Sequence, residues 1–331
     1  MKILLENNHH IFIISAILSI FTYCIIRFSA KLFPHFFGIC ESNNKTSMFH
    51  LPMIRGLGIF FPVILIISTF LVGTILSFFE IFIIMISTLI GFWDDKFTLG
   101  YKEKLIIFIC IGSIFSFYVC SNETEQSFSL LKFLLNLFFF VFLILFFNQI
   151  DGINGLASIT FLIVLFFLFL FGANLILFLP LIFSILVYFF INMRGKIGIQ
   201  GDAGSFFMGS FIAVLLINSL DYTQYGLIFF MISPIIFDIC STTMIKFYYG
   251  TNLSIGHRDN LYQRLVFKFN NHILITLSFA FFQIIFCLLL IFLLNTFSLF
   301  EVYSLLLVSG LALTFLFSYI ANAIQKKIIF K

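Results

Sequence analysis

The stretch IFIIMISTLIGFWDDK, Ile81–Lys96, sets the fold of this chain. It opens with thirteen uncharged residues and ends at two adjacent carboxylates, Asp94 and Asp95, followed by a lysine. A helix needs roughly 20 apolar residues to cross about 30 Å of hydrocarbon. Because ionisable side chains at membrane depth are costly, two like charges at the end of such a run indicate a functional position.

The composition of the whole chain supports a membrane protein. Of its 331 residues, 62% are hydrophobic and only 10% are charged, with a mean hydropathy of +1.17. A soluble domain cannot cover its surface with so few polar residues. The 54 phenylalanines are interpreted mainly as lipid-facing bulk. The six cysteines lack CxxC spacing and there is no long basic tract, so the sequence predicts neither a disulfide or zinc framework nor a nucleic-acid partner.

Apolar runs of about the spanning length recur along the chain. They predict an all-α, polytopic membrane helix bundle of about eleven transmembrane helices with short loops, forming a single integral-membrane domain over residues 1–331. The runs cover residues 11–33, 57–77, 78–94, 105–120, 131–148, 155–172, 174–192, 204–220, 227–247, 273–295 and 302–324.

The positive charges predict the orientation of this bundle. If each helix reverses direction, all but Lys2 and Lys132 of the 18 Lys and Arg fall on one side. By the positive-inside rule that side is cytoplasmic, with the N-terminus outside and the C-terminus inside the plasma (inner) membrane. Most acidic residues share the cytoplasmic side, whereas Glu80 and Asp221 fall on the other and are interpreted as ordinary loop residues.

Four polar segments on the predicted cytoplasmic side carry the candidate chemistry. They are Asp94–Lys96 with Lys104, NQIDGINGLAS at 148–158, NMRGKIGIQGDAGSFFMG at 192–209, and GHRDNLYQRL at 256–265. The segments repeat Asp, Asn, Gly, Lys and Arg, and they contain no Ser-His-Asp arrangement, paired Cys nucleophile or HExxH. We expect them to meet at helix ends over a water-accessible cleft.

These residue types suit metal-assisted phosphoryl transfer. Asp and Asn oxygens are ligands for Mg²⁺, which needs only one or two protein groups beside phosphate oxygens and water. The glycines around Asp202 let the backbone approach a phosphate at a helix N-terminus. Asp94 and Asp95 point about 100° apart on a helix. We therefore expect one of them to serve the metal or a lysine such as Lys104, and the other to orient or deprotonate an incoming oxygen acid.

The four segments resemble those of the polyprenyl-phosphate N-acetylhexosamine-1-phosphate transferase family, glycosyltransferase family 4. That family includes the phospho-MurNAc-pentapeptide translocase and the undecaprenyl-phosphate GlcNAc-1-phosphate transferases. Its motifs are GxxDD, NxxDGxDGLA, KIFxGDxGSxxLG and an HRxHxYQ-type loop. This chain has GFWDD, NQIDGINGLA, KIGIQGDAGSFFMG and HRDNLYQRL in the same order, from about residue 55 onward.

The resemblance implies an activity and its partners. A UDP-N-acetylhexosamine would donate sugar-1-phosphate to undecaprenyl phosphate in the membrane lipid, with Mg²⁺ or Mn²⁺ as cofactor. The products would be polyprenyl-diphosphate-sugar and UMP, the first step of a cell-surface polysaccharide of the O-antigen or cell-wall type. The active site would face the cytoplasm, between the helices at 78–94, 131–148 and 204–220 and under the 248–272 loop. The sequence leaves the sugar and the oligomeric state open, a homodimer included.

The resemblance also implies roles for residues at matching motif positions. The catalytic residues would be Asp94, Asp95 and Asp151. The metal ligands would be Asn148 and Asp202. The residues that hold the diphosphate and nucleotide would be Lys104, Asn154, His257 and Arg258.

Other interpretations stay open at this point. Asn260 replaces the second histidine of the fourth loop, and Arg55 and Gly56 keep only part of a PTPRGGG-like stretch. An isolated Asp94–Asp95 pair also fits a solvated helix cap, and Asp238 fits a residue that caps or orients its helix. At the level of the whole protein, the rivals are a transporter or flippase and a catalytically inactive scaffold member of the family.

Overall fold

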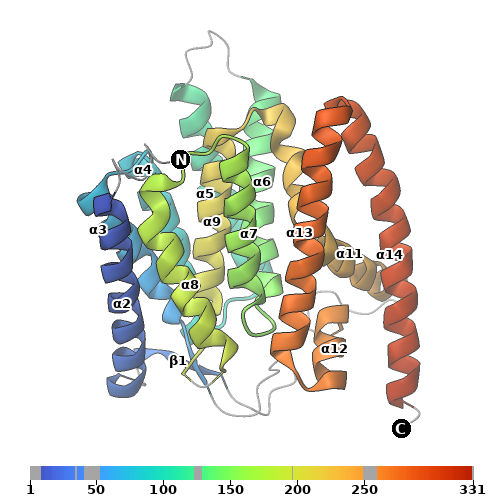
Figure 1. Ribbon diagram of the computed structural model, residues 1–331, viewed down its shortest axis with the longest axis horizontal. Helices are drawn as coiled ribbons and strands as arrows, with labels where there is room; N and C mark the ends of the chain where they lie inside the picture. The colour runs from blue at the N-terminus through green and yellow to red at the C-terminus, as the bar shows by residue number, and fades with distance from the viewer. Residues whose placement is uncertain are drawn as a thin grey trace.

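The computed structural model describes residues 9–33, 36–40, 53–122, 129–195, 197–248 and 259–329, and it confirms an all-α helix bundle (Figure 1). The α-helices of the described residues are α2 (His9–Leu32), α3 (Phe60–Val72), α4 (Phe78–Phe97), α5 (Tyr101–Asn122), α6 (Leu130–Ile150), α7 (Leu156–Leu170), α8 (Leu179–Met193), α9 (Gly201–Ser219), α10 (Ile228–Met231), α11 (Ser233–Tyr248), α12 (Leu261–Phe269), α13 (His272–Thr296) and α14 (Leu299–Ile329).

Short elements join these helices. The 3₁₀ turns are η2 (Leu57–Ile59), η3 (Ile176–Phe178) and η4 (Tyr222–Leu227). The strands β1 (Gly38–Cys40) and β2 (Met53–Arg55) pair antiparallel, with Gly38 opposite Arg55. They lie at the lower edge of the bundle in Figure 1, as does α12.

Each of the eleven predicted apolar runs coincides with a helix or a helix pair. Within the described residues, six elements are long and apolar enough to cross a membrane: α2, α5, α6, η3–α8, α9 and α13. The run expected as one helix at 227–247 is instead broken, because η4–α10 and α11 are bent by 82°. Pro234 explains the break, since proline lacks the N–H and disfavours a helical conformation in the residue before it.

Helix α9 occupies the middle of the bundle (Figure 1). Of its most apolar 18-residue stretch, 94% is buried inside the protein. Small residues allow its neighbours to approach closely, as is common between membrane helices. A Cβ on Gly91 of α4 would lie only 2.3 Å from the backbone oxygen of Asp202. A Cβ on Gly209 of α9 would lie 2.5 Å from the Cα of Ile144 in α6. The backbones of α4 and α6 are therefore packed directly against α9.

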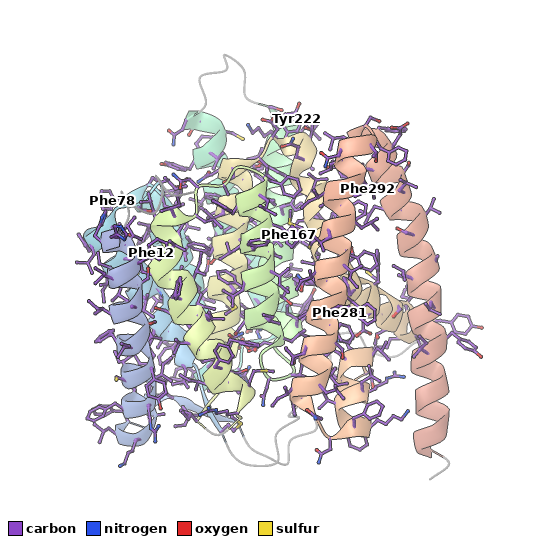
Figure 2. The ribbon with its side chains drawn as sticks, viewed as in Figure 1. Phe12, Phe78, Phe167, Tyr222, Phe281 and Phe292 are labelled. Carbon is purple, nitrogen blue, oxygen red and sulfur yellow. The ribbon has the colours of Figure 1, made fainter. Side chains whose placement is uncertain are left out.

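The phenylalanines divide between the core and the outer surface (Figure 2). Phe207 and Phe211 stack inside the bundle with ring centroids 5.7 Å apart, and both are fully buried. Phe78, Phe281 and Phe292 lie on the surface, with 87%, 61% and 61% of their area exposed. The outward rings are the ones that a bilayer would cover, so only part of the phenylalanine excess is lipid-facing bulk.

The end of the bundle away from the strands contains one correction to the sequence analysis. Glu80 is not a loop residue but lies in the first turn of α4, with 7% of its area exposed. It forms a capping box with Ser77 and accepts a hydrogen bond of 2.9 Å from Asn218 of α9. Glu80 therefore fixes α4 to α9 at the end of α4 opposite Asp94 and Asp95.

Candidate active site

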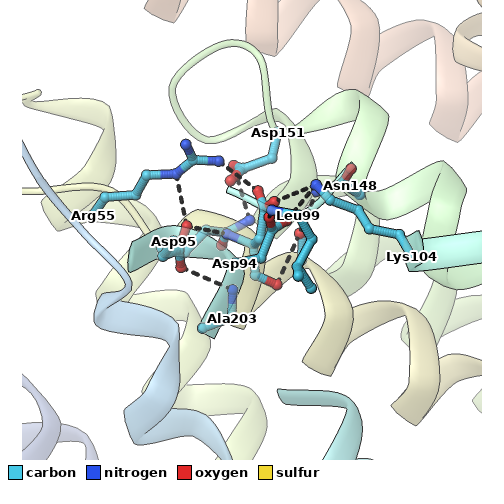
Figure 3. A network of polar contacts seen from close by, with 11 residues as sticks. Arg55, Asp94, Asp95, Leu99, Lys104, Asn148, Asp151 and Ala203 are labelled. Carbon is cyan, nitrogen blue, oxygen red and sulfur yellow. Dashed lines mark hydrogen bonds and ion pairs between the residues drawn. The ribbon is translucent and has the colours of Figure 1, made fainter. Parts of the chain in front are cut away.

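Four helix ends meet at one end of the bundle: the C-termini of α4 and α6 and the N-termini of α5 and α9. They bring the aspartates at 94, 95, 151 and 202 together with Lys104 and Asn148 (Figure 3). The three helices predicted to wall the site, near 78–94, 131–148 and 204–220, are among those that converge here. Every group in this cluster comes from a segment that the sequence analysis singled out, except Arg55.

Asp202 stands at the centre of the cluster, in the first turn of α9. Its Oδ1 pairs with the Arg55 guanidinium at 2.6 Å, and its Oδ2 pairs with the Lys104 ammonium at 3.0 Å. Only 6% of the residue is exposed. Arg55 and Lys104 approach the carboxylates from opposite sides in Figure 3. A buried carboxylate between two cations at a helix N-terminus stays ionised, because both the cations and the helix dipole favour its charged form.

Asp95 holds the N-terminus of α9 in place. Its two oxygens accept hydrogen bonds from the backbone N–H groups of Asp202, at 2.8 Å, and Ala203, at 3.1 Å. Its Oδ1 also pairs with Arg55 Nε at 2.6 Å, and its side chain is fully buried. Gly201 has φ of +68°, and a Cβ there would lie 2.4 Å from the carboxylate, so only glycine fits. Asp95 is therefore a cap for a helix distant in sequence.

Asp94 faces a different partner from its neighbour. One oxygen forms an ion pair with Lys104, and the other accepts a 2.6 Å hydrogen bond from the backbone N–H of Leu99. That bond closes the turn between α4 and α5, in which Thr98 adopts a left-handed conformation with φ of +46°. The turn returns the chain so that Lys104, one turn into α5, reaches Asp94 and Asp202 together.

Arg55 is the residue whose importance the sequence analysis missed. It is carried by a segment that pairs with the residues just before α9: Ile199 N–H donates to the Ile54 oxygen at 2.8 Å, and Gly58 N–H donates to the Gln200 oxygen at 3.0 Å. The charge of Asp202 raises the pKa of the Arg55 guanidinium, so it stays protonated. The signal in the sequence was an arginine beside glycines on the predicted cytoplasmic side. Its partners Asp95 and Asp202, however, lie 40 and 147 residues further along the chain.

Asn148, near the end of α6, and Asp151, just after it, form a second part of the cluster with residues at the N-terminus of α9. Gln200 donates to Asp151 Oδ1 at 2.9 Å and accepts from Ser158 at 3.2 Å. Asn148 donates its amide N–H to Ser205 at 3.4 Å, which leaves its oxygen available. Burial raises the pKa of the Asp151 carboxyl well above its ordinary value, and the charge of Asp202 raises it further. Gln200 was another residue that the sequence analysis did not identify.

Comparison with protein families agrees with this geometry. The profile described as glycosyl transferase family 4 matches residues 77–220, from the N-cap of α4 to the end of α9. The chain carries a glycosyl transferase family 4 domain. A comparison with curated proteins gives no match. This domain and the bundle of long apolar helices together support a membrane transferase of the glycosyl-1-phosphate kind.

Two parts of the site lie outside the matched segment of the family 4 domain. Arg55 precedes it, and α12 follows it. Asp238 of α11 accepts hydrogen bonds from the backbone N–H groups of Leu261, at 2.6 Å, and Tyr262, at 3.0 Å. The Tyr262 hydroxyl then donates to the Gln149 oxygen at 2.9 Å. Asp238 therefore caps α12, not its own helix, and α12 is fastened to the segment that carries Asn148 and Asp151.

Of the remaining predicted residues of the family 4 site, Asn154 is not part of the cluster. Asn154 contacts the start of α13: its backbone N–H donates to His272 Nδ1 at 3.3 Å, and its oxygen accepts from Thr276 at 2.7 Å. Its side-chain Oδ1 is buried without a hydrogen-bond partner among the described residues. His257 and Arg258 lie outside the described residues.

The cluster holds more carboxyl groups than cations. Four aspartates face two cations, Arg55 and Lys104, in a largely buried site. Within the described residues, no three His, Cys, Asp or Glu side chains are grouped so as to hold a metal ion by themselves. The oxygen donors instead suit a cation that takes one or two protein ligands and completes its shell with phosphate and water, as Mg²⁺ does.

Proposed function

We propose that this protein transfers sugar-1-phosphate from a UDP-N-acetylhexosamine to undecaprenyl phosphate, giving polyprenyl-diphosphate-sugar and UMP. The observation that carries the proposal is the buried Asp202, held at the N-terminus of α9 within a cluster of four carboxylates and two cations at one end of an apolar bundle. Four carboxyl groups beside two strong cations suit a metal-bound diphosphate, and the apolar surroundings suit a lipid acceptor.

The residues present fit Mg²⁺, with Mn²⁺ as the alternative. Asp202 and the free side-chain oxygen of Asn148 would hold it, and both are hard oxygen donors. When bound, the cation would neutralise the charge that develops on the phosphoryl oxygens.

The transfer itself is a displacement at phosphorus. An oxygen of the acceptor phosphate forms a bond to the β-phosphorus of the UDP-sugar, and the bond from that phosphorus to the bridging oxygen breaks. The bridging oxygen and its electron pair leave with UMP. Catalysis of this kind depends mainly on positioning and charge stabilisation.

Within this mechanism the aspartates have different roles. Asp94 orients Lys104, which would bind a phosphate oxygen of the diphosphate. Asp95 is a positioning residue that fixes α9 and Arg55. Asp151 keeps one oxygen without a hydrogen-bond partner among the described residues, so it is the carboxyl group best placed to bind or deprotonate an incoming group. The resemblance assigns Asn154, His257 and Arg258 to the nucleotide and diphosphate.

The cellular setting follows from the charge asymmetry of the loops. The site would face the cytoplasm, from which a UDP-sugar is supplied, in the plasma (inner) membrane. The whole chain would then act as one integral-membrane domain that begins a cell-surface polysaccharide of the O-antigen or cell-wall type. A homodimer is compatible with this role.

Two other functions fit the site less well. A transporter or flippase would place its charges near the middle of the membrane, whereas the ion pairs of this cluster join helix ends at one end of the bundle. An inactive scaffold member of the family would have no use for a buried carboxylate cluster. Both observations favour the enzyme.

The test is a reconstituted reaction. Purified protein in detergent is mixed with undecaprenyl phosphate, Mg²⁺ and a panel of UDP-N-acetylsugars, and UMP release is measured. We expect release only with lipid and metal, and a loss of at least a thousandfold in Asp202→Asn. The matched control is Asp221→Asn, which changes an exposed loop aspartate and should retain wild-type activity. Folded wild-type protein that releases no UMP from any sugar would favour the scaffold or the transporter.

A further inference from the structure

A pocket between α2 and α8 lies apart from the carboxylate cluster. It has a volume of about 400 Å³, within the usual range of small-molecule sites. Its polar lining consists of Tyr23, Arg27 and Arg194, and the rest is apolar, including Phe190 and Ile197. We propose that this pocket binds an anionic glycerophospholipid of the bilayer, with the headgroup phosphate between the two arginines and an acyl chain along the apolar wall.

The two guanidinium groups have unused hydrogen-bonding capacity. Arg27 donates one hydrogen bond, of 2.6 Å, to the Tyr23 hydroxyl, and its guanidinium lies 5.9 Å from the centre of that ring. Its other four N–H donors make no hydrogen bond to the residues that the structure describes. In the part of the chain that the structure describes, neither Arg27 nor Arg194 forms an ion pair with a carboxylate. The planar fork of arginine is well suited to phosphate oxygens.

No acidic residue of the two helices compensates this charge. Neither α2 nor α8 contains an Asp or Glu, and Lys31 adds a further positive charge one turn beyond Arg27. The charge of the pocket therefore favours an anion, and at a membrane interface the abundant anions are lipid headgroups. Basic pockets between membrane helices bind such headgroups.

The position of the pocket favours a lipid over a soluble phosphate. Arg27 lies near the C-terminus of α2, and Arg194 directly follows α8, so both are at an end of the bundle, where headgroups lie. The two helices run side by side in Figure 1 and end at the same edge as β1. The rings of Tyr23 and Phe190 are 37% and 60% exposed on the outer surface, where hydrocarbon would cover them. A soluble phosphate has no apolar part that could contact these side chains.

The experiment measures lipid binding to the full chain by native mass spectrometry. Delipidated protein in detergent is titrated with dioleoyl-phosphatidylglycerol, with dioleoyl-phosphatidylcholine, or with phosphatidylglycerol in the presence of millimolar inorganic phosphate. The wild type should bind the first phosphatidylglycerol at least tenfold more tightly than phosphatidylcholine. Inorganic phosphate should not displace it.

Substitutions locate the binding event. R27Q/R194Q should weaken binding of the first phosphatidylglycerol about tenfold, to the level of phosphatidylcholine. The matched control K102Q/K268Q removes two exposed lysines elsewhere and should bind as the wild type does. If the double variant does not fold, R194Q alone should still weaken binding severalfold. Equal affinity for the two lipids, displacement by inorganic phosphate, or wild-type affinity in R27Q/R194Q would each overturn the proposal.

Discussion

Asp94 and Asp95 are neighbours in sequence but have different partners. Asp94 pairs with Lys104, whereas Asp95 caps α9 and pairs with Arg55. Their divergence follows from the helix itself, because consecutive side chains point about 100° apart. Two like charges can therefore stand side by side, since each is compensated by its own cation. Asp95 contacts the backbone of Asp202 directly, and Asp94 shares Lys104 with the Asp202 carboxylate.

At this scale we predict that Asp95 matters for stability as well as for activity. Asp95→Ala removes the cap of α9 and leaves Arg55 with one carboxylate fewer, which should lower the free energy of unfolding by roughly 3 kcal/mol. The measurement is unfolding in detergent. The control Asp259→Ala removes a carboxylate whose side chain is 42% exposed and pairs with Lys246, and it should cost less than about 1 kcal/mol. Equal losses of unfolding free energy in the two variants would show that the cap of α9 does not contribute to stability.

Among the elements, α9 organises the site. It is the most deeply buried span, and its N-terminus holds Asp202 while its backbone contacts α4 through Gly91. The segment 54–58 adds Arg55 by pairing with residues 198–200. The relative position of α4 and α9 therefore sets the distances between the aspartates of the cluster.

The close approach of α4 and α9 gives a second prediction. Gly91→Ala adds a methyl group where only 2.3 Å is available beside the Asp202 backbone oxygen. The helices must separate, and we expect a loss of about 1–3 kcal/mol of stability together with most of the activity. Gly100→Ala is the matched control, because the nearest atom to its Cβ is the end of the Glu103 side chain at 3.6 Å. Unchanged activity and stability in Gly91→Ala would contradict this packing.

The attachment of α12 through Asp238 gives a third prediction. Asp238 is fully buried and accepts from both Leu261 and Tyr262, whereas an asparagine has a single oxygen to offer them. In Asp238→Asn, hydrogen exchange of the amides in α12 should therefore become faster, while exchange in α9 stays unchanged. The control is Asp259→Asn, just before α12. If α12 keeps its protection in Asp238→Asn, then Asp238 does not hold this helix.

The whole molecule shows which features were predictable from sequence. Hydropathy located all eleven helical runs, because burial in lipid depends on local composition. The motifs located Asp94, Asp151 and Asp202, because their spacing is local as well. Arg55 and the cap formed by Asp95 were missed, since they depend on segments that meet only after folding. The bend between α10 and α11 was missed because the apolar run continues through it.

Orientation in the membrane is a prediction for the whole molecule. In a variant without the native cysteines, a single cysteine is introduced at Lys102 or at Asp221, which lie at the N-terminus of α5 and beyond the C-terminus of α9. In intact cells, an impermeant maleimide should label the cysteine at 221 and should label the one at 102 only after permeabilisation. The reverse pattern would place the candidate site outside the cell.

The measurement that tests the central claim most directly is the identity of the nucleotide released. The protein is incubated with undecaprenyl phosphate, Mg²⁺ and a UDP-N-acetylsugar labelled with ³²P at the β-phosphate, and both the nucleotide and the lipid are analysed. Transfer of sugar-1-phosphate predicts unlabelled UMP and a labelled lipid. Labelled UDP with an unlabelled glycolipid would show transfer of the sugar alone and would contradict the proposed displacement at phosphorus.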